Sequence, residues 1–124
     1  MIYGTLALAR KYAEEGRIDE WLQDFLRADG KNMALAEGLL KEERYYFGLL
    51  EIPIALLSDV KSGAPEYLHA ANDIQYFFAV VDSMKESMAD GWDAPPLIVE
   101  YLYGRFKVDD GRHRLETYRQ LGVE

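Results

Sequence analysis

The sequence predicts an α+β (or α/β) protein in which N-terminal helices pack on a small mixed sheet. Three observations support this fold class. Apolar residues recur at helical spacing over the first forty residues, a second helical pattern covers about 67–89, and a short apolar run from Leu97 precedes a final helix. The 124 residues fit one domain, 1–124. Because no Pro/Gly-rich linker is present, the helical N-terminal extension (1–43) is expected to pack on the remaining core (44–124).

Three helices are predicted in the N-terminal extension. The first ends at Gly16, and Asn32 can cap the third. The second carries the strongest amphipathic pattern, and Asp29-Gly30 ends it. Its apolar stripe, at positions i, i+3, i+4, i+7 and i+8, consists of Ile18, Trp21, Leu22, Phe25 and Leu26.

The middle of the chain predicts one strand and one long helix. The aromatic segment 45–50 is typical of a strand, and 51–54 continues it at a sheet edge, because Pro53 cannot donate a hydrogen bond to a neighbouring strand. A long helix is expected over about 67–89. Its buried stripe is expected to consist of Ile74, Phe77, Phe78, Val81, Met84 and Met88.

The C-terminal part predicts a hairpin followed by a helix. Its strands are 97–99 and 106–108, and the first is apolar on both faces, which is typical of a buried strand. The helix covers 112–121, and Gly122 is expected to follow its end. The residues expected to point inward from it are Leu115, Tyr118 and Leu121.

Composition excludes several classes of function. The net charge of −8 disfavours DNA as a partner. The absence of cysteine excludes a disulfide framework, a thiolate zinc site and a cysteine nucleophile, and it suits a cytoplasmic protein. The longest apolar stretch, 49–57, is far short of the ~20 residues of a membrane span, so no membrane association is expected. The segment 105–119 departs from the acidic average: it carries +2, and the remaining chain carries −10.

The turn 109–114, with the sequence Asp-Asp-Gly-Arg-His-Arg, is the candidate functional site. The N-terminus of the helix that follows leaves N–H groups without intrahelical partners and carries partial positive charge. Gly111 allows close approach of the backbone to a ligand. Arg112, His113 and Arg114 lie in the first turn, where cations are unfavourable for the helix, and a bound phosphate would compensate.

Asp110 has several alternative roles. It can cap the helix, hold a metal ion or act as a base. A simpler interpretation makes Asp110 an ordinary N-cap and the basic residues a solvated helix face. The residues by themselves support the phosphate site and this simpler interpretation equally.

The segment from Pro96 to Gly122 resembles the core of the ParB/sulfiredoxin superfamily. The shared pattern is a proline-led buried strand (Pro-Leu-Ile-Val), a hairpin strand (Phe-Lys-Val), the motif D-G-x-H-R, and a helix that ends in Leu-Gly. The resemblance covers about residue 45 to the end, and the N-terminal part resembles the leader of small ParB-like proteins of Gram-positive bacteria.

This resemblance implies that a nucleotide such as ATP or CTP binds at the turn. Gly111 and the following amides, Arg112 included, would hold phosphate, and His113 and Arg114 would bind its oxygens. Asp110 matches an acidic residue that belongs to the catalytic site of free-serine kinases, which implies a catalytic role. As a carboxylate it can also hold Mg²⁺. Those kinases place further active-site residues after the first strand, where Ser58, Asp59 and Glu66 are rival candidates.

The chain also departs from the family. Sulfiredoxins have a cysteine where this chain has Arg112, which excludes their chemistry. Partitioning ParB proteins carry G-E-R-R and a following helix-turn-helix region, whereas here Arg112 and His113 replace Glu and the first Arg. Relatives usually add a core strand after this helix, so we expect either a different closure of the sheet or residues beyond Glu124.

The expected function is therefore a ParB-like nucleotide (phosphate)-binding domain, with phosphotransferase or nucleotidase activity as its enzymatic form. The alternative is a non-enzymatic module in which nucleotide binding gates association with a protein partner. A nuclease or DNA-partitioning protein is a third alternative, which the acidic charge disfavours.

Overall fold

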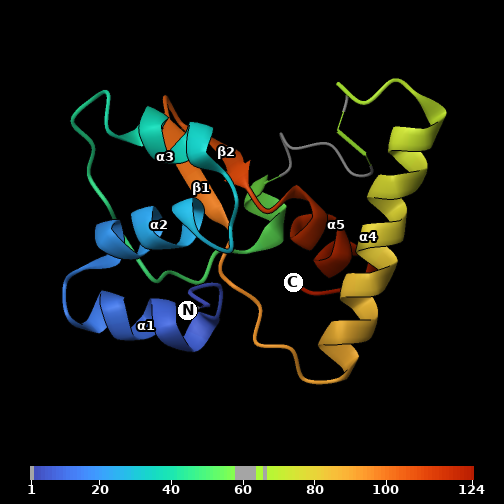
Figure 1. Ribbon diagram of the computed structural model, residues 1–124, viewed down its shortest axis with the longest axis horizontal. Coiled ribbons are helices and arrows are strands. Elements are labelled where there is room, and N and C mark those ends of the chain that lie inside the picture. Colours follow the sequence, from blue (N-terminus) through green and yellow to red (C-terminus); the bar gives the residue numbers. More distant parts are fainter. Residues whose placement is uncertain (1, 58–63, 66) are drawn as a thin grey trace. The chain divides into compact units, whose positions relative to one another are not determined.

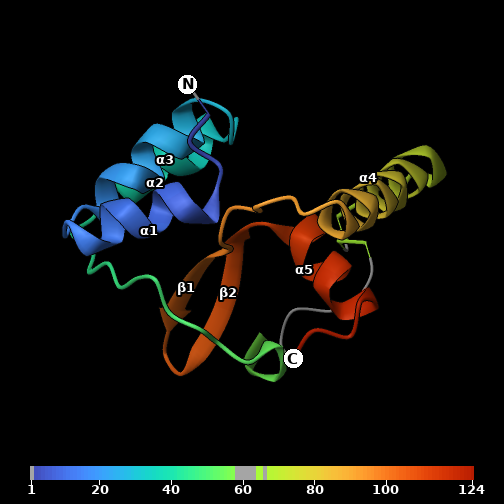
Figure 2. The same ribbon diagram turned by 90° about the horizontal axis from the view of Figure 1, so that it is seen from below.

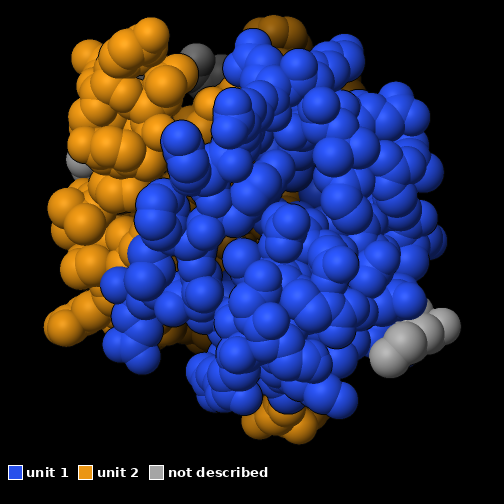
Figure 3. All heavy atoms as spheres, turned by 90° about the vertical axis from the view of Figure 1, so that its left-hand side faces the viewer, with its two compact units in different colours: residues 1–51, 93–96 blue, residues 52–92, 97–124 orange. Residues whose placement is uncertain are grey.

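The computed structural model describes residues 2–57, 64–65 and 67–124 (Figure 1). This part of the chain contains five α-helices and one two-stranded antiparallel sheet, which confirms the α+β class. The chain divides into two compact units, coloured separately in Figure 3. The first comprises 1–51 with 93–96, and the second comprises 52–92 with 97–124.

The first unit contains three helices, as the sequence predicts. They are α1 (Leu6–Glu14), α2 (Ile18–Arg27) and α3 (Met33–Leu39). The side chain of Thr5 caps α1 by accepting a hydrogen bond from the Leu8 N–H group. Asn32 caps α3 in the same way, which confirms its predicted role.

The core of the first unit is built on α2. The Trp21 ring is buried and stacks on Phe25, with 4.9 Å between ring centroids. Its indole N–H donates to the Tyr3 carbonyl at 2.9 Å. The Asp29 carboxylate accepts hydrogen bonds from the N–H groups of Tyr3 and Gly4, so the turn after α2 holds the N-terminal segment.

The second unit consists of a hairpin, two helices and a short 3₁₀ helix. Its elements are η1 (Ile54–Leu57), α4 (Ala71–Ala89), β1 (Ile98–Leu102), β2 (Arg105–Asp110) and α5 (Arg112–Gln120). Helices α4 and α5 lie side by side (Figures 1 and 2). One buried apolar cluster contains Leu57, Val108 and Leu115, so η1, β2 and α5 share a core.

The hairpin brings the candidate site to the end of β2. Tyr103 and Gly104 both have positive φ, at 51° and 78°, as a two-residue type I′ turn requires. Val99 pairs with Val108, but Ile98 pairs with Asp110, so Asp109 is an extra residue on β2. This bulge lies immediately before the turn into α5.

The strand predicted over 45–50 is wrong. Within the described residues the sheet contains only β1 and β2, so it is antiparallel and not mixed. Tyr45 and Phe47 are 84% and 79% exposed, and η1 begins at Ile54, where the edge strand was expected to continue. Aromatic residues favour a strand only where a neighbouring strand pairs with it, and no such strand is described beside this segment.

Helix α4 is shorter and less buried than the sequence predicts. It begins at Ala71 and not near residue 67, and only Phe77 and Val81 of its expected stripe are fully buried. Leu121, expected to point inward, lies beyond the end of α5 and is 48% exposed. None of the helices in the described ranges is long and apolar enough to cross a membrane.

Candidate functional site

The predicted turn lies where β2 passes directly into α5. Asp110 is the last residue of the strand, and Gly111 occupies the N-cap position with a φ of 109°. The Leu115 N–H group donates to the Gly111 carbonyl at 2.8 Å, and this bond begins the helical ladder. The N–H groups of Arg112, His113 and Arg114 precede that bond, which is the arrangement that helices use to bind anions.

Gly111 is packed too tightly to carry a side chain. A Cβ atom there would lie 2.6 Å from Leu97 Cδ2 and 2.8 Å from Arg114 Nη2. Its positive φ is also one that residues with a side chain rarely adopt. The turn therefore depends on glycine for both its backbone conformation and its contacts.

We expect Gly111→Ala to lower the free energy of unfolding by about 2–3 kcal/mol, because backbone strain and steric overlap add. Gly91→Ala is the matched control. Gly91 has a φ of 88° but open space around a Cβ, so only the strain of about 1 kcal/mol applies. Urea denaturation of both variants measures the difference. Equal losses would contradict the close packing at Gly111.

Asp110 and Arg114 form an ion pair at the base of the turn. Arg114 Nη2 lies 3.1 Å from Asp110 Oδ2, and the two side chains are 8% and 18% exposed. Gly111 and not Asp110 is the N-cap, and Arg114 is buried, so the interpretation as an ordinary cap with a solvated basic face does not describe this turn. Most of the charge of Arg114 is compensated within the protein.

His113 lies against α4. Its ring is 4.5 Å from the Phe77 ring, centroid to centroid, and Thr117 donates its hydroxyl hydrogen to the His113 carbonyl at 2.7 Å. Burial lowers the pKa of His113, the nearby Arg114 lowers it further, and Asp110 opposes both. These effects favour the neutral imidazole in the unliganded protein.

The bulge residue Asp109 forms a second acidic feature beside the turn. Burial raises the pKa of Asp109, and a hydrogen bond and charge repulsion from the Glu100 carboxyl raise it further. The Asp109 side chain is 8% exposed, and exposed Lys107 lies 3.6 Å away. The folded protein therefore disfavours the charged form of Asp109.

We expect Asp109→Asn to stabilise the protein at pH 7, by some tenths to about 1 kcal/mol. Folding raises the pKa of Asp109, so its carboxyl is harder to ionise in the folded protein than in the unfolded chain. The resulting loss of stability is absent below the pKa of the unfolded chain, and it is complete once the pH has risen through the pKa of the folded protein. The gain should therefore disappear in acid. Denaturation curves at several pH values, with exposed Glu86→Gln as control, measure it. A gain that is independent of pH would contradict this account.

Several predicted site residues remain without a structural test. Ser58, Asp59 and Glu66 lie outside the described residues. Among the residues that are described, no group of three or more His, Asp or Glu side chains is placed to hold a metal ion. Asp110, the expected Mg²⁺ ligand, contacts Arg114. A metal there would have to compete with this guanidinium or be held mainly by a bound phosphate.

Comparisons with known proteins do not identify the chain. No family model, curated protein or solved structure matches it. The ParB/sulfiredoxin resemblance therefore stays a prediction that rests on the motif between Pro96 and Gly122.

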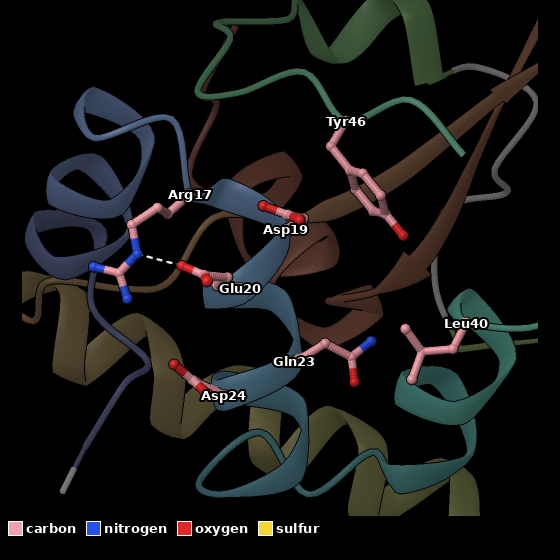
Figure 4. A pocket seen from close by; sticks show the side chains of 7 residues that line it. All are labelled: Arg17, Asp19, Glu20, Gln23, Asp24, Leu40 and Tyr46. Carbon is pink, nitrogen blue, oxygen red and sulfur yellow. Dashed lines mark hydrogen bonds and ion pairs between the residues drawn. The ribbon is translucent and has the colours of Figure 1, made fainter. Parts of the chain in front are cut away.

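The first unit contains a surface groove of about 450 Å³ (Figure 4). It is lined by Arg17, Asp19, Glu20, Gln23, Asp24, Leu40 and Tyr46. Arg17 is engaged by the carboxylates of Glu20 and Glu15, and the lining carries three carboxylates in all. Because these carboxylates repel anions, the groove does not suit a phosphate, and the turn at Gly111 remains the candidate site.

Proposed function

We propose that the N-terminus of α5 binds the phosphates of a nucleotide such as ATP or CTP. The observation that carries the proposal is the turn at Gly111, where β2 passes directly into α5 and the N–H groups of Arg112, His113 and Arg114 precede the first bond of the helical ladder. Helix termini of this kind attract anions through these N–H groups and the helix dipole. The local charge of +2 over 105–119, in a chain of −8, supports the same choice.

The three basic residues contribute differently to such a site. Arg112 is partly exposed and supplies charge directly to the ligand. His113 supplies a hydrogen bond. Arg114 lies behind the turn, where its pair with Asp110 holds the guanidinium against Gly111, so it orients the turn more than it neutralises the ligand.

Whether the site also catalyses depends on Asp110. In phosphotransferase or nucleotidase chemistry the protein mainly positions phosphates and neutralises charge, and Mg²⁺ shares that work. The ion pair with Arg114 occupies the carboxylate that would serve as base or metal ligand. This pairing favours the second candidate function, a non-enzymatic module in which nucleotide binding gates association with a protein partner.

Thermal unfolding with and without nucleotide tests the proposal. ATP, CTP and pyrophosphate, each with and without Mg²⁺, are expected to stabilise the protein by mass action, by about 2.7 kcal/mol at a hundredfold excess over Kd. Arg112→Ala should reduce this stabilisation, because it removes one positive charge from the turn. Arg10→Ala, an exposed charge change on α1, is the control and should leave it intact. If no nucleotide or pyrophosphate raises the melting temperature, the proposal is wrong.

Nucleotide turnover separates the two forms of the function. Release of phosphate or transfer to an acceptor, lost in Asp110→Asn, would assign an enzyme. Binding without turnover would assign the nucleotide-gated module.

A further inference from the structure

His113 belongs to the proposed phosphate site and to the contact between α4 and α5. It is the second residue of α5, so its backbone N–H lies in the anion-binding turn. Its ring is partly buried against Phe77, and its carbonyl is held by the Thr117 hydroxyl. The imidazole is therefore held against α4 while it remains within electrostatic range of Asp110 and Arg114 in the turn.

Two opposing charges act on the ring. Arg114 disfavours the protonated form, and Asp110 favours it. Asp110 is paired with Arg114 at 3.1 Å, so its negative charge is already compensated. Helix α4 packs against the ring with the apolar Phe77, and the acidic residues closest to Phe77 in the α4 sequence, Asp73 and Asp82, are exposed. In the described surroundings of His113, the balance favours the neutral imidazole.

We propose that phosphate binding at α5 is coupled to the uptake of one proton by His113. This inference rests on the proposed function. A phosphate at the turn adds negative charge to the surroundings of an imidazole whose described acidic influence, Asp110, is already paired with Arg114. Such a charge favours the imidazolium form. The proton comes from solvent and adds to a ring nitrogen, so no other reactant is needed.

Linkage fixes the direction of the effect. If phosphate favours protonated His113, then protonation of His113 must favour phosphate by the same factor. Affinity therefore rises as pH falls through the titration range of His113. At pH values low enough that the ring is already protonated in the free protein, the affinity no longer changes with pH. The site would therefore bind its ligand more tightly in mild acid than at neutral pH.

The direct test is an NMR titration of the two histidine rings from pH 5 to 8, with and without saturating ATP. Saturating ATP is expected to raise the pKa of His113. Because the NMR signals report the protonation of the His113 ring directly, protons that ATP gains or loses do not affect the measured pKa. If His113 titrates identically in both samples while ATP binding still depends on Arg112, the coupling is wrong and the proposed function stands.

Sulfate provides the second test, because its charge does not change over this pH range. Its affinity is expected to be about threefold or more higher at pH 5.5 than at pH 7.5, and independent of pH in His113→Gln. His69→Gln is the matched control and should keep the wild-type dependence. A flat sulfate profile in the wild-type protein overturns the coupling. If ATP, pyrophosphate and sulfate all fail to bind, both the proposed function and the coupling are wrong.

Discussion

Replacing Phe77 by alanine is expected to lower the free energy of unfolding by about 3–5 kcal/mol. The ring is 1% exposed, lies edge-on to Phe78 with 5.4 Å between centroids, and contacts the His113 ring. Its loss would open a cavity between α4 and α5. Because burial is the largest cause of the lowered pKa of His113, the same change should bring that pKa back toward its ordinary value.

Tyr76→Ala is the matched control for this prediction. Tyr76 is the neighbouring residue on α4 but is 71% exposed, so its replacement should change stability by no more than about 0.5 kcal/mol. Urea denaturation of both variants and an NMR titration of His113 supply the measurements. If Phe77→Ala proves as harmless as Tyr76→Ala, α4 does not pack on α5 as described.

Most helices and the hairpin could be predicted because their signals are local. Asn32 caps α3, and the stripe on α2 buries Trp21, Phe25 and Leu26, as the spacing predicts. Gly122 follows α5 with a φ of 74°. Caps, turns and a 3.6-residue period depend on residues a few positions apart, so one sequence is enough to find them.

The sheet was less predictable because strand pairing is not local. The segment 45–50 has the aromatic composition of a strand, yet β1 and β2 alone form the described sheet. The predicted buried stripe on α4 was only partly correct, for a related reason. Only α5 is closely packed along α4 among the described elements, which buries Phe77 and Val81 but leaves Met84 and Met88 partly accessible. The sequence pattern identifies an apolar helix face, but it does not indicate how many other elements will pack against that face.

The candidate site was predictable in position but not in chemistry. The glycine of the motif marked the N-terminus of α5 correctly. The pair between Asp110 and Arg114 has the i,i+4 spacing of helical ion pairs and could have been inferred. The contact between Phe77 and His113 contributes to the burial that lowers the pKa of His113. It joins distant parts of the chain and had no local signal.

Arg114→Met is expected to lower the free energy of unfolding by about 3 kcal/mol, because it removes one partner of a largely buried ion pair. The Asp110 carboxylate would keep its charge but lose this guanidinium. Changing Asp110 to Asn in the same chain should recover part of the loss. A double-mutant cycle should then give a coupling energy of about 1–3 kcal/mol.

Lys85 and Asp82 on α4 provide a matched pair for that cycle. Their charged atoms lie 3.4 Å apart, but the Asp82 side chain is 70% exposed, so their coupling should stay below about 0.5 kcal/mol. Similar coupling in both pairs would contradict the buried character of the Asp110–Arg114 pair.

The single variant Asp110→Asn connects this ion pair with function. It removes a negative charge beside the proposed phosphate site, so nucleotide binding should tighten if the carboxylate only orients Arg114. If Asp110 is a base or a Mg²⁺ ligand, turnover should be lost, and Mg²⁺ should no longer promote binding. Binding and turnover measured on this one variant therefore distinguish a residue that shapes the turn from one that performs chemistry.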